Sequence, residues 1–287
     1  MTTPTDDALP LRDAGGPSAL SGGWRRMWEL CLLISVTDFK RNYFGTALGY
    51  VWSLMRPLLL FVVLLEVFTH VFRLGSQIPH YPVVLLFNIV FFSFFQEATT
   101  NSVSSVVSYE GIVRKTQFPR LAIPVSILLT ALYNLAFNMV VVFIFILGFG
   151  VSPMWTWLLL PVLTAIMAIF ALGVSMLLSS LYPRFRDISI IWGVFVTALF
   201  YATPILFPFD KVRHASATLA HLIAINPLTP IFELARRWFI DPSAPLPGTA
   251  ATGGRTALAI AGVIYVTVCV LGVWVFRREA PRIAEEL

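Results

Sequence analysis

Apolar runs of about 20 residues recur along this chain, and they restrict its fold more than any other feature. A bilayer core of about 30 Å takes about 20 residues of helix to cross. Runs of that length cover about 52–72, 82–107, 121–149, 155–181, 188–207 and 256–276. Because a backbone in lipid must satisfy its own hydrogen bonds, each run is predicted to be a helix. The chain is therefore predicted to be an all-α integral membrane protein with six transmembrane helices.

The composition agrees with a lipid-facing surface. Charged residues make up 12% of the chain, against about 25% in an ordinary soluble domain. Hydrophobic residues reach 57%, and the mean hydropathy is +0.81. The formal net charge of +5 could indicate nucleic-acid binding. The basic residues flank the apolar runs instead of forming one block, however, so no nucleic-acid partner is predicted.

The distribution of Lys and Arg predicts the orientation, because short cytoplasmic loops are enriched in these residues. With the amino end inside, most of the 20 basic residues fall on the inner side: Arg12, Arg25, Arg26, Lys40, Arg41, Arg56, Arg114, Lys115, Arg120, Arg184, Arg186, Arg277, Arg278 and Arg282. Most of those on the outer side lie in the long 208–255 segment, where the rule is weak. Six spans then place both termini in the cytoplasm.

The segments between the spans complete the predicted organisation. Residues 1–23 form a polar, flexible cytoplasmic tail, 24–278 form the transmembrane domain, and 279–287 form a second cytoplasmic tail. Residues 24–43 combine aromatic and charged residues at helical spacing, which is typical of a helix lying in the inner membrane interface. Apolar stretches within 217–239 are too short to span, so a re-entrant or surface-lying helical hairpin is expected on the outer side.

The sequence shows no sign of enzyme chemistry. Nucleotide-binding, serine-hydrolase and zinc-protease motifs do not occur in it. Neither the four histidines nor Cys31 and Cys269 have the spacing of metal ligands, so no metal site, catalytic residue or cofactor is predicted in this chain. Glu66, and Gln96 with Glu97, fall inside predicted spans, where ionisable groups are costly. Glu97 opens a polar stretch that either packs against neighbouring helices or relays protons, and packing is favoured.

Five segments, taken in order, resemble the membrane subunits of ABC exporters for polysaccharides. They are RNYFGTALGYVWSLMRPLL (41–59), EGIVRKTQFPRLAIPVS (110–126), YPRFRDI (182–188), TPILFP (203–208) and NPLTPIFELAR (226–236). The resemblance extends from about residue 24 to residue 278. It implies a half-transporter, in which two copies of this chain form a conduit and two ATPase subunits on separate chains bind ATP and Mg²⁺.

The resemblance also implies roles for particular residues. Residues 24–43 would be the interface helix, and 110–118 would be a coupling helix that docks into the ATPase. The charged and apolar residues of that loop offer contacts for docking: Glu110, Arg114, Lys115, Phe118 and Arg120. A purely topological role of its basic residues is the alternative. Four cations at the inner headgroup level are candidates for binding the diphosphate of a lipid carrier: Arg25, Arg26, Lys40 and Arg41.

Aromatic residues and the outer hairpin supply the remaining candidates. Phe61, Phe68, Phe72, Phe200 and Tyr201 are candidates for lining the conduit, because flat apolar rings suit the C–H faces of sugars. Packing in the core or against lipid is the alternative for each of them. The hairpin, with Asn226, Pro227 and Pro230 at its centre, is a candidate outer gate.

The resemblance implies export of a polyprenyl-diphosphate-linked glycan of the galactan, O-antigen or teichoic-acid type across a bacterial cytoplasmic membrane, in contact with membrane lipid. Only Lys40, Lys115 and Lys211 are lysines, and this arginine bias slightly favours an actinobacterial galactan over an O-antigen. An ABC exporter of a drug or small lipid is the first alternative. An ion-coupled secondary transporter would show inverted repeats and paired broken helices, and no convincing repeat is visible. A membrane-embedded glycosyltransferase or acyltransferase is a further alternative, and it would act without an ATPase.

Overall fold

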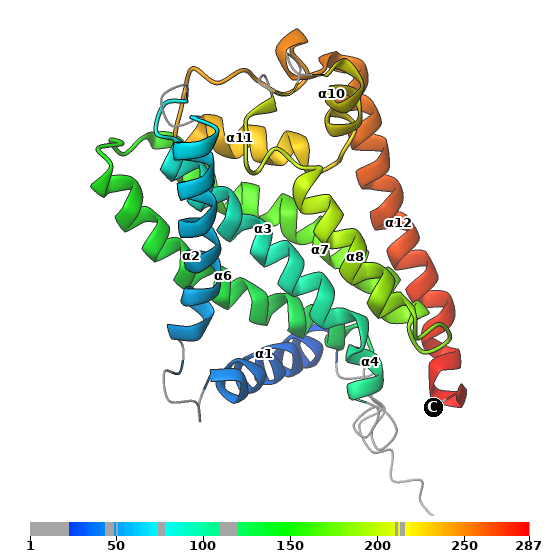
Figure 1. Ribbon diagram of the computed structural model, residues 1–287. Coiled ribbons are helices and arrows are strands. Elements are labelled where there is room, and N and C mark those ends of the chain that lie inside the picture. Colours follow the sequence, from blue (N-terminus) through cyan, green and yellow to red (C-terminus); the bar gives the residue numbers. More distant parts are fainter. Residues whose placement is uncertain are drawn as a thin grey trace, which may run out of the picture.

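A computed structural model describes residues 23–43, 49, 51–73, 78–109, 120–209, 212 and 216–286. Within these ranges the protein is built from helices and contains no strand, which confirms the predicted all-α class (Figure 1). The helices are α1 (Gly23–Tyr43), α2 (Val51–Glu66) with its π-helical continuation η1 (Val67–Val71), α3 (Tyr81–Val103), α4 (Ser105–Ser108), α6 (Ala122–Gly148), η3 (Trp155–Leu159), α7 (Leu160–Leu181), α8 (Ile188–Tyr201), α10 (Ala217–Ala224), α11 (Thr229–Phe239), η4 (Ala250–Thr252) and α12 (Gly254–Glu286).

Five helical segments of the described chain are long and apolar enough to cross a membrane: 51–71, 81–103, 122–148, 155–181 and 254–279. They correspond to the first four predicted spans and the last one. The last helix extends well beyond the predicted end at Phe276, and residues predicted to form a tail continue it to Glu286. Inner and outer denote here the two ends of the bundle that the basic residues assign to the two sides of the membrane.

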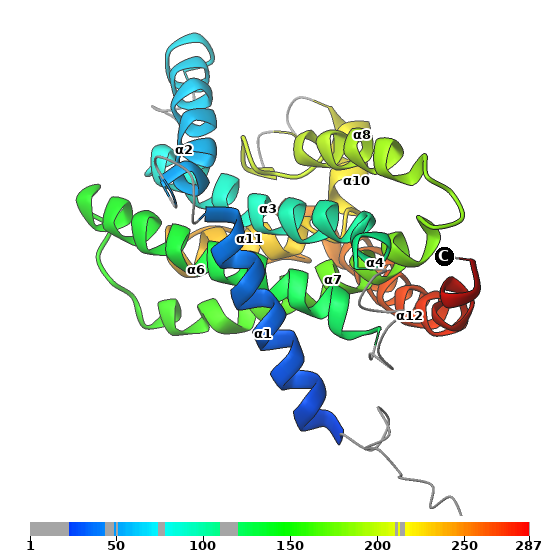
Figure 2. The same ribbon diagram turned by 90° about the horizontal axis from the view of Figure 1, so that it is seen from below.

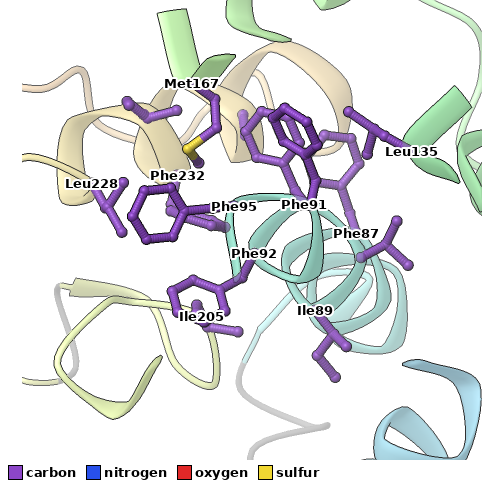
Figure 3. Packing of buried hydrophobic residues seen from close by; sticks show 14 of the residues in the cluster. Phe87, Ile89, Phe91, Phe92, Phe95, Leu135, Met167, Ile205, Leu228 and Phe232 are labelled. Atoms are coloured by element: carbon purple, nitrogen blue, oxygen red, sulfur yellow. The ribbon is translucent and has the colours of Figure 1, made fainter. Parts of the chain in front are cut away.

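The core is centred on α3, which is buried along most of its length. Phe87, Phe91, Phe92 and Phe95 project from this helix in several directions (Figure 3). The ring of Phe95 stacks on Phe170 of α7 at 5.7 Å between centroids, while the ring of Phe91 meets Phe232 of α11 edge-on at 5.8 Å. Helices α6, α7, α8 and α2 all contact α3. Since aromatic pairs add about 0.5–1.5 kcal/mol beyond burial, this helix fixes the positions of its neighbours.

The predicted fifth span differs from a simple helix. The helix α8 is only 14 residues long and ends at Tyr201, because Pro204 disfavours helical geometry at Thr203. The irregular segment that follows is buried, and Asn88 of α3 donates to the carbonyls of Pro204 and Ile205 at 3.3 and 3.2 Å. The Tyr81 hydroxyl donates to the carbonyl of Leu206 at 2.9 Å. Side chains of α3 thus supply hydrogen-bond donors for backbone carbonyls that lipid could not pair.

The same contacts show that this segment runs antiparallel to α3. Near its inner end, the Trp192 indole donates to the Thr99 hydroxyl at 3.2 Å, and near its outer end Leu206 meets Tyr81. The segment therefore covers nearly the whole length of α3. A short helix and an irregular extension together take the place of the predicted helix over 188–207.

The predicted interface helix is α1, which passes beneath α6 at the inner end of the bundle (Figures 1 and 2). Cys31, Ser35 and Phe39 recur every four residues and form the face directed at α6. Cys31 and Ser35 are fully buried, whereas Leu33 on another face is 65% exposed. Such a helix has one side on protein and apolar residues left for lipid, as expected for the membrane interface.

The predicted outer hairpin is formed by α10 and α11, whose axes are bent by 82° at the break between them. Asn226 lies at this break and is buried. Its side chain donates to the carbonyl of Ala202 and to the hydroxyl of Thr203 at 3.0 and 2.9 Å, and it accepts from the Leu228 amide at 3.0 Å. One side chain thus joins the bend to the end of α8.

Helices α7 and α12 approach each other at two glycines. A Cβ on Gly272 would lie 2.1 Å from the carbonyl oxygen of Gly173, and a Cβ on Gly173 would lie 2.8 Å from the Cα of Cys269. Such distances leave no room for a side chain between the two backbones. Small residues permit this kind of close approach between membrane helices, where packing replaces the hydrophobic effect as the driving force.

We predict that Gly272→Ala destabilises the protein by about 1–3 kcal/mol, the usual cost of overpacking, because its methyl group would clash with the Gly173 backbone. Gly262→Ala is the matched control, since it lies in the same helix and a Cβ there meets nothing within 4 Å. Thermal unfolding of the purified protein in detergent measures both. Equal melting temperatures for the two variants would contradict the close crossing.

Candidate functional site

A polar cavity of about 330 Å³ opens at the inner end of the bundle. It is formed where the interface helix α1 meets α3, α4 and α6. Its lining residues are Asp38, Arg41, Asn101, Ser105, Ser108, Tyr109, Ile127 and Thr130. Most of these side chains are polar, so the cavity differs from the aromatic core directly above it.

The serine-rich sequence of the second span explains why the cavity forms here. The hydroxyls of Ser102 and Ser105 donate to the carbonyls of Ala98 and Ser102, both at 2.7 Å. Such local bonds compete with the regular helical pattern. The predicted helix over 82–107 accordingly ends at Val103, turns at Ser104 and resumes as the short α4. This turn brings the polar side chains of α4 to the cavity.

Asp38 and Tyr109 connect the interface helix to the end of α4. The Tyr109 hydroxyl donates to the Asp38 carboxylate across the cavity. Burial, reinforced by this hydrogen bond, raises the pKa of Tyr109 above its ordinary value, so the phenol stays protonated near neutral pH. On the same helix as Asp38, the backbone carbonyl of Ser35 accepts a hydrogen bond from the Thr130 hydroxyl at 3.3 Å. The ring of Phe39 stacks on that of Phe137 at 5.9 Å between centroids. These contacts hold α1 against α6.

The four cations predicted to bind a lipid diphosphate do not form one cluster. Arg41 lines the cavity, and Lys40 beside it is exposed. Arg25 lies at the other end of α1, roughly 24 Å away by helix length, where it pairs with Glu29 at 3.1 Å. The side chain of Arg26 lies outside the described residues. Among the described members of the set, only Arg41 belongs to the cavity.

The predicted ATPase-coupling segment directly follows the cavity-lining residue Tyr109 in the sequence. Glu110, Arg114, Lys115 and Phe118 fall in 110–119, which lies outside the described residues. The two residues on either side are described: Tyr109 lines the cavity, and Arg120 is partly exposed just before α6. The coupling segment is therefore joined to α4 and α6 next to the interface helix.

A second, smaller cavity of about 180 Å³ lies between the α7–α8 connection and α12, and the sequence analysis did not single it out. Arg184 and Arg278 contribute to its lining. The Arg184 guanidinium lies 5.6 Å from the ring centroid of Phe185, and that of Arg278 lies 5.4 Å from the ring centroid of Trp274. The motif at 182–188 and the basic end of the last span could have indicated this pairing, because both were assigned to the inner surface.

The polar stretch that begins at Glu97 makes contacts between helices. Asn134 of α6 donates to the Glu97 carboxylate, and Arg56 of α2 interacts electrostatically with the same group. The Ser175 hydroxyl of α7 donates to the carbonyl of Ala98 at 3.2 Å. Trp192 of α8 reaches Thr99, as described above. The stretch joins α3 to four other helices, which favours the packing interpretation over a proton relay.

The five candidate conduit aromatics occupy different environments. The ring of Phe61 is buried and meets Phe145 edge-on at 5.4 Å, so it packs within the single chain. Phe200 is partly buried against Phe92 at 5.3 Å. Phe72 and Tyr201 are 58% and 60% exposed, while Phe68 is half-buried beneath Phe72. Only Phe72 and Tyr201 present most of their surface outside the chain.

The candidate gate residues lie at the centre of the outer hairpin. Asn226 and Pro227 form the break, and Pro230 lies in the first turn of α11. Sequence reasoning missed Glu233, which is 3% exposed and accepts a bond from the Phe209 amide at 3.3 Å. Its neighbours three and four residues away include Thr229, Arg236 and Arg237, so the local pattern gives no signal of its burial. Arg236, also buried, pairs with Asp241 at 3.3 Å.

The family follows from comparison with known proteins. The family model described as ABC-2 type transporter matches residues 29–240, a range that runs from the interface helix to the end of the outer hairpin. The chain belongs to the ABC-2 type transporter family. It is accordingly a membrane subunit for transport, and the resemblance inferred from the five sequence segments is confirmed.

Individual relatives are similar over most of the chain. The O-antigen export system permease protein RfbA of Klebsiella pneumoniae is 31% identical over 263 residues, which cover 91% of this chain and 96% of that protein. A protein of the same name from Myxococcus xanthus is 27% identical and covers 75% of this chain and 82% of its own length. The polysialic acid transport protein KpsM of Escherichia coli is 21% identical over 216 residues.

We predict that Tyr109→Phe lowers the free energy of unfolding by about 1–3 kcal/mol, because the Asp38 carboxylate loses its donor. The raised pKa of Tyr109 means that this contribution is fully present at neutral pH and declines as the pH rises above about 10, where the unfolded phenol ionises. Thermal unfolding in detergent measures the effect. The difference in melting temperature between wild type and the variant should be smaller above pH 10 than at pH 7.

Tyr133→Phe is the matched control, since it removes a phenolic hydroxyl from the neighbouring α6 and keeps the ring that meets Phe39 edge-on. A Tyr109→Phe variant as stable as wild type at pH 7 would show that the bond across the cavity contributes nothing.

Proposed function

We propose that this chain is the permease subunit of an ABC exporter that moves a polyprenyl-diphosphate-linked polysaccharide outward across the cytoplasmic membrane. The observation that carries the proposal is the 31% identity to an O-antigen export permease over 91% of this chain and 96% of that protein. A likeness of that extent leaves out only about a tenth of this chain.

Two copies of the chain would form the transporter, with an ATPase subunit bound to each. Such subunits would dock on segment 110–118, which starts beside Tyr109. Tyr109 is hydrogen-bonded to Asp38 of α1, so a movement of the docked segment would be transmitted directly to this helix. The interface helix in turn contacts α6 through Ser35 and Phe39. This series of contacts supports a route by which movement driven by ATP hydrolysis would reach the membrane helices. Both termini of the chain would lie in the cytoplasm.

The cavity beside α1 is a suitable receptor for the diphosphate of a lipid carrier. Arg41 supplies a cation, and the serine, threonine and asparagine side chains of the lining supply neutral donors. The opening lies at the inner interface, where the headgroup of a carrier lipid would arrive. The negative charge of Asp38 would repel an anion, but its carboxylate already accepts a hydrogen bond from the Tyr109 hydroxyl.

Helices α2 and α8 are suited to flank the conduit. Seen from below, both lie on the same side of α3 (Figure 2). Each exposes apolar and aromatic surface beyond the single chain, including Phe72 at one end of α2 and Tyr201 at the end of α8. A second copy facing this side would enclose a passage lined with such residues, and the hairpin α10–α11 would close it on the outer side.

The similarity to O-antigen permeases favours a glycan of that type, whereas the arginine-rich composition favours a galactan. Analysis of the surface glycan lost on deletion of the gene would decide between them. A drug or small-lipid exporter would leave all surface glycans unchanged. A transporter driven by an ion gradient would keep working after ATP depletion and stop when the proton gradient collapses.

We predict that the double substitution Arg114→Glu and Lys115→Glu uncouples ATP hydrolysis from export. Reversing two charges should weaken the docking of the ATPase, because each broken charged contact of about 1.5–3 kcal/mol lowers the affinity about tenfold or more. The amount of surface polysaccharide should therefore fall to roughly a tenth of wild type or less. Immunoblotting of surface glycan and co-purification with the ATPase measure the two effects. Arg255→Glu, an exposed charge reversal at the outer end, is the control. Unchanged export by the double variant would refute the coupling role.

A further inference from the structure

The outer half of α2 carries an ionisable pair that the function described so far does not use. Nδ1 of His70 lies 2.9 Å from Oε2 of Glu66, and the two side chains are 70% and 65% exposed. Glu66 ends the α-helical part of the span, and His70 lies in the π-helical turn η1. Turns of this type are rare and are often found at functional sites.

The pair continues an exposed face of α2. Leu59, Val62, Val63 and Glu66 are spaced three or four residues apart, which places them on one side of the helix. Each of the three apolar residues is more than half exposed, whereas Pro57 and Phe61 on another side are buried. Within the described chain, α2 thus packs on one side and leaves its Glu66 side uncovered.

Lipid is an unfavourable environment for the Glu66–His70 end of this face. Glu66 lies five residues before the end of the span at Val71, which is roughly 8 Å along the helix axis. Ionisable groups inside a span are costly in hydrocarbon and almost always face other protein or a water-filled cavity. A glutamate side chain is also too short to extend to the headgroups as lysine and arginine do.

We propose that the Glu66–His70 side of α2 borders a water-filled passage and that the pair binds sugar hydroxyls of the exported glycan. The inference rests on the proposed function, because a second copy must enclose the passage. A carboxylate and an imidazole are good partners for hydroxyl groups.

Cysteine labelling in intact cells expressing the complete transporter tests the water-filled passage. In a background with Cys31→Ala and Cys269→Ala that still exports, Glu66→Cys, His70→Cys and the deeper Val63→Cys should each react with a charged, membrane-impermeant maleimide. Ile260→Cys is the matched control, because Ile260 is 47% exposed and lies a similar number of residues from the outer end of α12. It should react only with a lipid-soluble maleimide.

Labelling of His70→Cys alone, with Glu66→Cys and Val63→Cys behaving like Ile260→Cys, would overturn the proposal, since it would show only interfacial water.

Export measurements test the sugar contact. Glu66→Leu and His70→Leu should each lower surface glycan about tenfold or more, the effect of losing a hydrogen bond to a charged group, and Glu66→Gln should restore part of it. Val263→Leu, on the exposed side of α12, should leave export unchanged.

The two proposals fail in different ways. If deletion of the chain leaves surface glycans intact, the proposed function is wrong, whatever the labelling shows. If deletion abolishes the glycan but Glu66→Leu and His70→Leu export it at the wild-type rate, only the assignment of the pair is wrong.

Discussion

The rest of the structure depends on the burial of α3. Its phenylalanines reach α7, α8 and α11. Two of its polar side chains accept hydrogen bonds from α6 and α8, and its Ala98 carbonyl accepts one from α7. A helix surrounded by protein can carry residues that lipid would not tolerate, such as Asn88 and Glu97. Those residues in turn make the irregular end of the α8 segment possible, because Asn88 satisfies carbonyl groups that no helix pairs. The position of one helix therefore determines both the packing and the polar connections of its neighbours.

The sequence predicted the long spans well, because uninterrupted apolar runs leave few alternatives in a membrane. The interface helix and the outer hairpin were also predicted correctly from mixed composition and from the Asn226-Pro227 interruption. Two of the misplaced boundaries have different physical reasons. The second span ended early because serine hydroxyls donate hydrogen bonds to nearby carbonyls. The fifth ended at Tyr201 because of Pro204, and its irregular continuation is stabilised by residues more than 100 positions away in sequence, which no local pattern reveals.

The candidate site was less predictable, because side-chain partners depend on how helices cross. Four cations on α1 suggested one phosphate site, yet the length of this helix separates its two ends. Of the cations whose side chains are described, only Arg41 reaches the cavity. Tyr109 and Asp38 were not singled out, since nothing in either segment indicates that they meet. Phe61 and Phe72 looked alike as members of one aromatic stripe. Their different exposure depends on which side of α2 meets Phe145 of α6.

The contact between Gly173 and Gly272 restricts how this chain can move. Two backbones that touch without side chains between them resist both sliding and separation, so α7 and α12 are expected to behave as one rigid body. The outer hairpin is attached to that body, because the Trp157 indole just before α7 donates to the Phe239 carbonyl at 3.2 Å. Helix α2 has no comparable anchor on its uncovered side. A transport cycle built on this chain would therefore pivot α2 against a stationary frame formed by α7 and α12.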